Sequence, residues 1–187
     1  MLIIGYADVS SLNISNFNYE DFCKQRIEYL STITDPKRKK QSFFVWRLLL
    51  NVIGEFGLDP SKLIFNKTSS GKWVCDRGLF FCLSHSDDIV AVSVSDDLLN
   101  SIDVQVCKPS IIATVKKINK NNAINSKFMS DIIDATKHWT LFELKTKGLF
   151  ECVDSFVIKD LNGLDYVLSY TFKNDGNNKP IIKKYQF

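Results

Sequence analysis

Histidine is nearly absent from this chain of 187 residues, which has only His85 and His138. The cysteines number five, an odd count, and no two of them form a CxxC pair. Zinc sites draw on clustered cysteine and histidine ligands, so no zinc centre is expected. We expect the thiols to be reduced and packed in apolar surroundings, as in a cytosolic protein.

Long apolar runs and a strong excess of charge are also missing. The most apolar stretch, 43–53, is interrupted by Arg47 and is far shorter than the roughly 20 residues that span a bilayer. The start, 1–5, has no basic residues before its brief apolar run, so we expect no signal peptide, no membrane partner and a cytoplasmic location. The net charge is only +3, which gives little support to a nucleic-acid-binding function.

Apolar residues make up 45% of the chain and aromatic residues 12%, enough for a sizeable core. The order of strand-like and helix-like segments occurs twice, so we expect an α+β fold of two similar halves, 1–98 and 99–187, with a ligand site at their boundary. Helices are expected at 19–30, 36–56 and 130–147, with Phe22, Ile27 and Leu30 facing inward in the first, and a loop at 116–127. Strands are expected at 2–9, 63–65, 72–75, 79–83, 89–94, 100–106, 155–159, 165–172 and 180–185, with a turn at 84–88.

The strand expected at 100–106 alternates apolar and polar residues, which puts Asp103 and Gln105 on one face. A carboxylate and a carboxamide two residues apart on a rigid strand make half of a hard-cation site. Mg²⁺ prefers one or two protein carboxylates, completed by water and substrate phosphates. The alternative for this strand taken alone is a solvated outer face at the edge of a sheet.

The helix expected at 130–147 carries Glu143 and Lys147, which share a face because they are four residues apart. Glu143 would supply the missing metal carboxylate, with Lys147 beside it as a phosphate anchor. The alternative is an exposed ion pair of little energetic weight.

Two further segments indicate an anionic ligand. Four cations at 37–40 lie at a helix N-terminus, where the helix dipole disfavours positive charge. Ser84 and His85 follow a strand and could donate to a phosphate, although a simple turn histidine is the alternative. No acid–base partner pattern of a serine hydrolase accompanies them.

In this order and spacing, the segments resemble the phosphopantetheinyl transferases of the Sfp type. That family carries a Gly-Lys-Pro element, a Phe-Asn-x-Ser-His-Ser hairpin, a Gly-[Ile/Val]-Asp-x-Glu strand and a Trp-[Ser/Thr]-x-Lys-Glu-[Ser/Ala]-x-x-Lys helix. The counterparts here are GKW at 71–73, FCLSHS at 81–86, SIDVQ at 101–105 and WTLFELKTK at 139–147, preceded by a basic helix start, DPKRKK, at 35–40.

The resemblance implies a pseudo-dimer of two similar α/β halves with coenzyme A in the cleft between them. It implies Mg²⁺ bound by Asp103 and Glu143, with Gln105 where a third metal ligand usually lies. The phosphate contacts it implies are Lys147 for the pyrophosphate, His85 with Arg47 and Lys40 for the 3′-phosphate, Ser84 and Lys72 around them, and Lys37 at the rim.

The implied activity is Mg²⁺-dependent transfer of the 4′-phosphopantetheine arm of coenzyme A to a serine of an apo acyl- or peptidyl-carrier protein, releasing 3′,5′-ADP. The enzyme is expected to be a monomer, and the lysine-rich stretch 116–120 to receive an acidic carrier. Gln105 replaces the motif's Glu and Phe142 its Lys, so a weak or inactive coenzyme A-binding homologue is the alternative. The segment 111–128 has no carboxylate, which leaves the general base open between a metal-bound water, Asp131 and Asp134.

Overall fold

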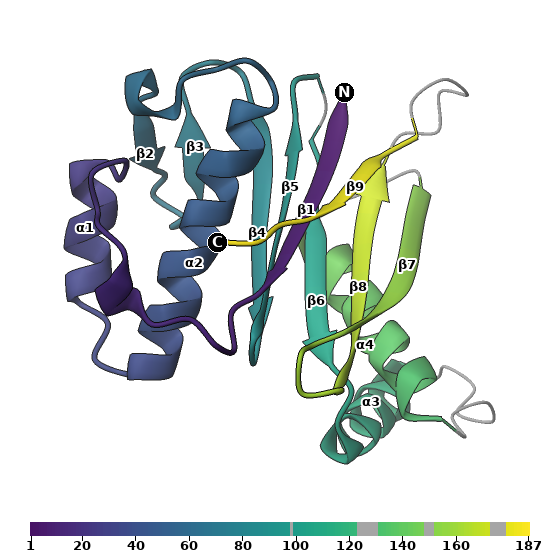
Figure 1. The fold of residues 1–187 in the computed structure, drawn as a ribbon. Coiled ribbons are helices and arrows are strands. Elements are labelled where there is room, and N and C mark those ends of the chain that lie inside the picture. Colours follow the sequence, from purple (N-terminus) through teal and green to yellow (C-terminus); the bar gives the residue numbers. More distant parts are fainter. Residues whose placement is uncertain (98, 123–130, 148–151, 173–178) are drawn as a thin grey trace.

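The computed structural model describes residues 1–97, 99–122, 131–147, 152–172 and 179–187. Over these ranges the chain is a mixed α+β protein, with three sheets and four α-helices. The two larger sheets lie side by side in the middle of the molecule, and helices cover their outer faces (Figure 1).

The first large sheet has the strand order β4-β5-β1-β9. Strand β1 pairs antiparallel with β5 and parallel with β9, and β4 pairs antiparallel with β5. The strands are β1 (Leu2–Asp8), β4 (Phe80–Ser86), β5 (Ile89–Ser95) and β9 (Ile181–Lys184).

Helix α2 (Pro36–Gly54) packs on one face of this sheet, chiefly against β5. Asp35 begins the helix by accepting a hydrogen bond from the Arg38 N–H at 2.6 Å, and Pro36 occupies its first turn. The side chains of Phe43 and Trp46 on α2 are fully buried. Around α2 lie α1 (Lys24–Ser31), the hairpin of β2 (Phe65–Lys67) and β3 (Trp73–Cys75), and the short 3₁₀ helices η1 (Ile14–Asn16) and η2 (Pro60–Lys62).

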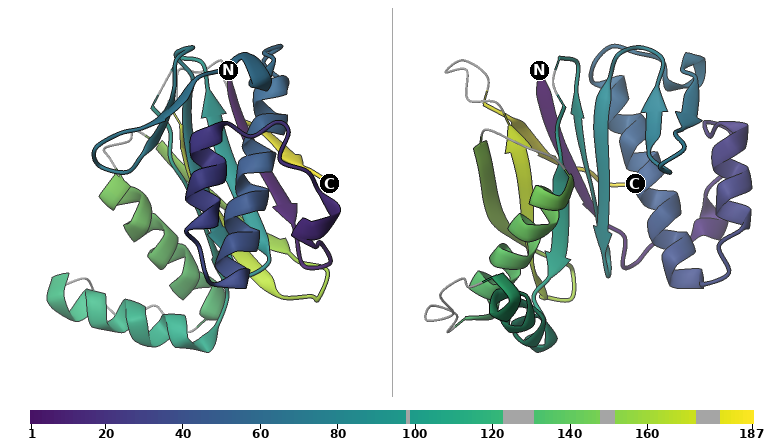
Figure 2. Two further views of the ribbon diagram at one scale, coloured as in Figure 1. Left: turned by 90° about the vertical axis from the view of Figure 1, so that its left-hand side faces the viewer. Right: turned by 180° about the vertical axis from the view of Figure 1, so that it is seen from behind.

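The second large sheet has the antiparallel order β6-β8-β7. Helix α4 packs on β8 and β6, and α3 packs on α4 (Figure 2). These elements are β6 (Ile102–Val106), β7 (Cys152–Lys159), β8 (Asp165–Phe172), α3 (Pro109–Asn122) and α4 (Ile132–Lys147).

The elements of the two large sheets follow a similar order, a strand, two helices and a hairpin, except that η2 and the β2–β3 hairpin lie between α2 and β4 in the first. The first strand pairs with the last strand of the hairpin in both cases, β1 with β5 and β6 with β8. The second helix of each set covers that central strand, α2 on β5 and α4 on β8. Strand β9 is outside this repeat and joins the first sheet beside β1.

The inner faces of the two sheets pack together in a second hydrophobic core, which we call the inter-sheet core. Ile4 and Ala91 come from the first sheet, and Val104, Tyr166 and Leu168 from the second. Their side chains are at most 2% exposed. The halves are therefore joined by a continuous apolar surface.

Several sequence-based expectations are wrong in detail. Residues 116–122 belong to helix α3, not to a loop. Helix α1 begins at Lys24, and Ile27 is 39% exposed while Arg26 is 2% exposed. Ser84 to Ser86 lie on strand β4, and only the two residues after them form the turn.

No helix of the described ranges is both long and apolar enough to cross a membrane.

Candidate functional site

Serine side chains of β4 bond to the open edge of β6. The Ser84 hydroxyl accepts a hydrogen bond from the Val104 N–H at 3.1 Å, and Ser86 accepts one from the Val106 N–H at 3.0 Å. Because β6 is the edge strand of its sheet, these N–H groups face away from β8 and need acceptors elsewhere. The serines of the Ser-His-Ser segment thus join the two halves.

Asp103 lies at this junction. The Ser84 Oγ donates to Asp103 Oδ1 at 3.0 Å, and Asp103 is only 8% exposed. Its neighbour on the same face of β6, Ser101, is 1% exposed. The alternative of a solvated strand face is therefore wrong. A buried carboxylate also needs partners that compensate its charge.

A chain of hydroxyl groups attaches α4 to the face of the sheet that carries Asp103. Asp103 is the register partner of Ser169 on β8, so the two side chains share a face. The Ser169 hydroxyl lies 2.7 Å from the Thr140 hydroxyl of α4 and 2.6 Å from that of Ser155 on β7. Glu143 follows Thr140 by three residues on α4 and is half-buried, so it lies along the same side of the helix.

Gln105 lies two residues beyond Asp103 on the same face of β6 and is half-buried. The donor set of Asp103, Glu143 and Gln105 contains only oxygen ligands, which fits Mg²⁺. No group of three or more His, Cys, Asp or Glu side chains suited to a metal occurs within the described ranges; the proposed set has two such residues and an amide. Lys147 ends α4, and its side chain lies outside the described residues.

His85 alternates with Ser84 and Ser86 along β4 and so faces the side of the sheet covered by α2. His85 is exposed at the surface, yet desolvation by its neighbours lowers the pKa of the imidazole below its usual 6.5, and the positive charges of Arg38 and Arg26 lower it further. The cations that influence His85 are thus Arg38, one of the four cations at 37–40, and Arg26, which no sequence motif indicates.

Arg47 and Lys40 lie against the N-terminal segment. The guanidinium of Arg47 lies 5.1 Å from the centre of the Phe17 ring, and the Lys40 ammonium donates to the Ser10 carbonyl at 2.9 Å. These contacts do not bring either residue to His85, where the resemblance implied a shared phosphate site.

Lys37 takes part in an ion-pair cluster that joins the two halves. Asp87, in the β4–β5 turn with a φ of 45°, pairs with Lys37 of α2 and with Lys108 just before α3. Burial alone would raise the pKa of Asp87, but the two lysines lower it, and Asp87 raises the pKa of Lys37. The Asp87 carbonyl also accepts a hydrogen bond from Gln41 at 2.8 Å. The sequence does not predict Asp87 and Lys108 as site residues, because they belong to no motif.

Lys72 is exposed in the turn between β2 and β3, where its backbone pairs with Thr68. Next to this hairpin, the buried Arg26 guanidinium lies 4.6 Å from the ring centre of Trp46 and 5.6 Å from that of Trp73. Burial lowers the pKa of Arg26 to about 10. Arg26 therefore holds α1 to its neighbours by ring contacts and by bonds to Ser42.

The two candidate bases lie at the start of α4. Asp131 accepts a hydrogen bond from the Ile133 N–H at 3.0 Å, a helix-capping contact, and Asp134 lies 4.0 Å from Lys137. Asp134 precedes Glu143 by nine residues, or roughly 13 Å along the helix axis. Neither residue is placed next to Glu143.

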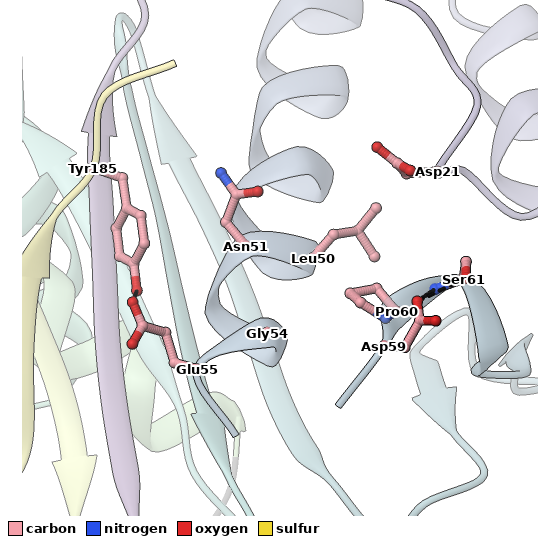
Figure 3. Close-up of a pocket in the computed structure, with 9 residues that line it drawn as sticks. All are labelled: Asp21, Leu50, Asn51, Gly54, Glu55, Asp59, Pro60, Ser61 and Tyr185. Atoms are coloured by element: carbon pink, nitrogen blue, oxygen red, sulfur yellow. Dashed lines mark hydrogen bonds between the residues drawn. The ribbon is translucent and has the colours of Figure 1, made fainter. Parts of the chain in front are cut away.

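A shallow groove of about 520 Å³ opens beside α2, near the C-terminal end of that helix (Figure 3). Two of its acidic side chains have partners: Glu55 bonds to Lys183 at 2.7 Å and Asp59 to Ser61 at 2.7 Å. None of the sequence-predicted site residues lines it. The lining residues are Asp21, Leu50, Asn51, Gly54, Glu55, Asp59, Pro60, Ser61 and Tyr185.

Compared with known proteins, the chain matches no family model and no curated protein. The arrangement of Asp103, Ser84 and α4 is chemically suited to holding a hard divalent cation at the junction of the halves. Arg38, an exposed cation whose charge acts on His85, is suited to an anionic ligand.

Proposed function

We propose that the protein transfers the 4′-phosphopantetheine arm of coenzyme A to a serine of an apo acyl- or peptidyl-carrier protein, with Mg²⁺ and with release of 3′,5′-ADP. It would thus act as a holo-[acyl-carrier-protein] synthase of the Sfp type. One observation carries the proposal: Asp103 is buried where the two halves meet, on the sheet face that the helix of Glu143 covers.

The repeated order of strand, two helices and hairpin supports the finer proposal that the fold is a pseudo-dimer. In such a fold the ligand cleft lies between the halves. The hydrogen bonds from β4 to β6 occur at that boundary, and so does the ion-pair cluster of Asp87. Three of the sequence motifs, 35–40, 81–86 and 101–105, contribute a residue to these contacts.

Asp103, Glu143 and Gln105 would hold Mg²⁺, which supplies polarisation of the pyrophosphate and stabilises charge on the leaving phosphate. The chain's own residues then bind and orient. Arg38, whose positive charge lowers the pKa of His85, would together with His85 present positive charge and an N–H donor to a phosphate. The carrier serine would attack the β-phosphate as the bond to the nucleotide phosphate breaks, and its proton would pass to water, since Asp131 and Asp134 are remote.

The test is carrier modification with Asp103→Ala and Glu143→Ala. Each variant is incubated with coenzyme A, Mg²⁺ and a panel of apo-carriers, and the carriers are weighed by mass spectrometry. We expect both substitutions to abolish the Mg²⁺-dependent mass gain, while Asp134→Ala, a carboxylate on the same helix, keeps it. Wild-type turnover in the Asp103→Ala/Glu143→Ala double variant would refute the site assignment.

A second candidate function is coenzyme A binding without transfer. It is favoured by Gln105, which lowers the negative charge of the metal site, and by Phe142, which is 36% exposed where the family motif has a lysine. Calorimetric binding of coenzyme A, together with an absence of mass gain on every carrier tested, would establish this candidate instead.

A further inference from the structure

The geometry points to Ser84 as a positioning residue that orients the Asp103 carboxylate, and not as a phosphate contact. This inference rests on the proposed function, because it assigns Asp103 to a metal. It departs from the role that the resemblance implied for Ser84, which was a place in the phosphate shell.

The Ser84 hydroxyl has two partners of opposite kind. A serine hydroxyl has one proton and two lone pairs. One lone pair accepts the Val104 N–H at 3.1 Å, and the proton goes to Asp103 Oδ1 at 3.0 Å. Because the single proton is used on the carboxylate, Ser84 cannot also donate to a phosphate oxygen.

The backbone contact fixes where the hydroxyl oxygen lies. Val104 belongs to β6 and is 2% exposed, so its N–H is held rigidly by the inter-sheet core. Ser84 itself is 9% exposed and Asp103 is 8% exposed. Rotating the Asp103 carboxylate away would break a charge-assisted bond in a site with little access to water. The hydroxyl of one half therefore restricts the carboxylate of the other half to one orientation.

Ser86 provides a matched control within the same strand. It is also 9% exposed, and it accepts the Val106 N–H at 3.0 Å. The residue that precedes Val106 is Gln105, so the position equivalent to Asp103 carries no acid. Ser84→Ala and Ser86→Ala each remove one acceptor from the β6 edge, but only Ser84→Ala removes the donor to Asp103.

The experiment measures Mn²⁺ affinity by electron paramagnetic resonance, in the presence of coenzyme A, for the wild type and for each variant. Partners that orient metal ligands typically contribute about 10- to 100-fold in metal affinity. We expect Ser84→Ala to weaken Mn²⁺ at least about tenfold, Ser86→Ala to change it less than about twofold, and Ser84→Thr, which keeps the hydroxyl, to restore it. Ser84→Cys, which keeps the shape but donates weakly, should behave like Ser84→Ala and serves if the alanine variant fails to fold.

A role in binding phosphate would have a different signature. Coenzyme A affinity without metal would then fall in Ser84→Ala while Mn²⁺ affinity stayed the same, and this result would overturn the inference. On the proposed role, the Mg²⁺ concentration needed for half-maximal rate rises and kcat falls, while the KM for coenzyme A stays within about twofold because no phosphate contact is lost.

Crystal structures of Ser84→Ala and Ser86→Ala separate this inference from the proposed function. The Asp103 carboxylate should turn from its wild-type orientation only in Ser84→Ala; an unchanged carboxylate there would overturn the inference, whatever reaction the protein catalyses. A wild-type protein that modifies no carrier would overturn the proposed function, while the orientation of Asp103 would still decide the role of Ser84.

Discussion

His85 carries an imidazole whose pKa is lowered by its surroundings. Desolvation by its neighbours and the charge of Arg38 both lower the pKa of the imidazole, which favours the neutral ring in the free protein. A phosphate group close to the ring would favour the protonated form and raise this pKa. Ligand binding and protonation of His85 are therefore linked.

We predict that coenzyme A binding takes up a proton at His85 between the free and bound pKa values. The free value lies below 6.5, so affinity should rise as the pH falls from about 7.5 towards 6, a window around the ordinary histidine pKa. Calorimetry in two buffers of different ionisation enthalpy measures the uptake. His85→Asn should remove it, and equal uptake in that variant would assign the proton to another group.

The sequence predicted which way a side chain faces where polar and apolar residues alternate with the period of a strand. It failed where a positively charged side chain is buried. The alternation along β6 placed Asp103 on a face distinct from Val104, and the structure confirms it. Ile27 was expected to face inward, but Arg26 does so instead. The flat guanidinium of Arg26 lies 5.0 Å from the ring centre of Tyr29 and bonds to Ser42. A hydrophobicity pattern counts arginine as outward-facing, so it could not find this contact.

Helix α3 lies where a loop was expected from residue 116 onward. Its lysines and asparagines read as loop, yet Ile111 and Val115 are four residues apart and pack against Ala135 of α4. This apolar stripe stabilises the helix only through the tertiary contact, which the local sequence does not reveal. The polar side carries the exposed Lys116 and Lys117. The stretch 107–130 contains no Asp or Glu.

We predict that Lys116→Glu/Lys117→Glu weakens docking of an acidic carrier. The KM for the carrier should rise about tenfold and its dependence on salt should flatten, because attraction between opposite charges is lost. The values of kcat and of the KM for coenzyme A should stay near those of the wild type. Lys24→Glu, an exposed lysine of α1 in the other half, is the control. Unchanged carrier kinetics in the Lys116→Glu/Lys117→Glu variant would mean that the carrier binds to another surface.

Strand β1 has no room for a side chain at Gly5. A Cβ there would lie 2.7 Å from Val52 Cγ2 and 3.1 Å from Tyr185 Cε2, so the Val52 side chain would have to shift and Tyr185 would have to give by a few tenths of an ångström. We predict that Gly5→Ala lowers the free energy of unfolding by ~1–3 kcal/mol, the usual result of overpacking. Urea unfolding measures it. Gly54→Ala, at a glycine with open space around it, should not destabilise, since alanine favours helices. Equal stabilities of the two variants would show that α2 moves freely.

At the scale of the whole molecule, the two halves are joined by contacts between residues that are far apart in the sequence. Most elements of each half were predictable because they follow from local patterns, but helix α3 was not. The partner of the last strand was not: β9 returns to pair with β1, a contact between opposite ends of the chain. The face-to-face packing of the sheets was also not predictable, because either face of β5, which is buried throughout, fits a core.

We predict that the two halves unfold together, because the inter-sheet core belongs to both. Val104→Ala, at a side chain 2% exposed in that core, should lower the free energy of unfolding by roughly 2 kcal/mol. Native-state hydrogen exchange of the central strands β5 and β8 should show the same opening free energy in the wild type and the same loss in the variant. Val157→Ala, on β7 of the second sheet and 41% exposed, should change neither strand. A loss confined to β8 would instead mean that the second half opens alone, and the orientation of Asp103 by Ser84 would then be interrupted whenever it did.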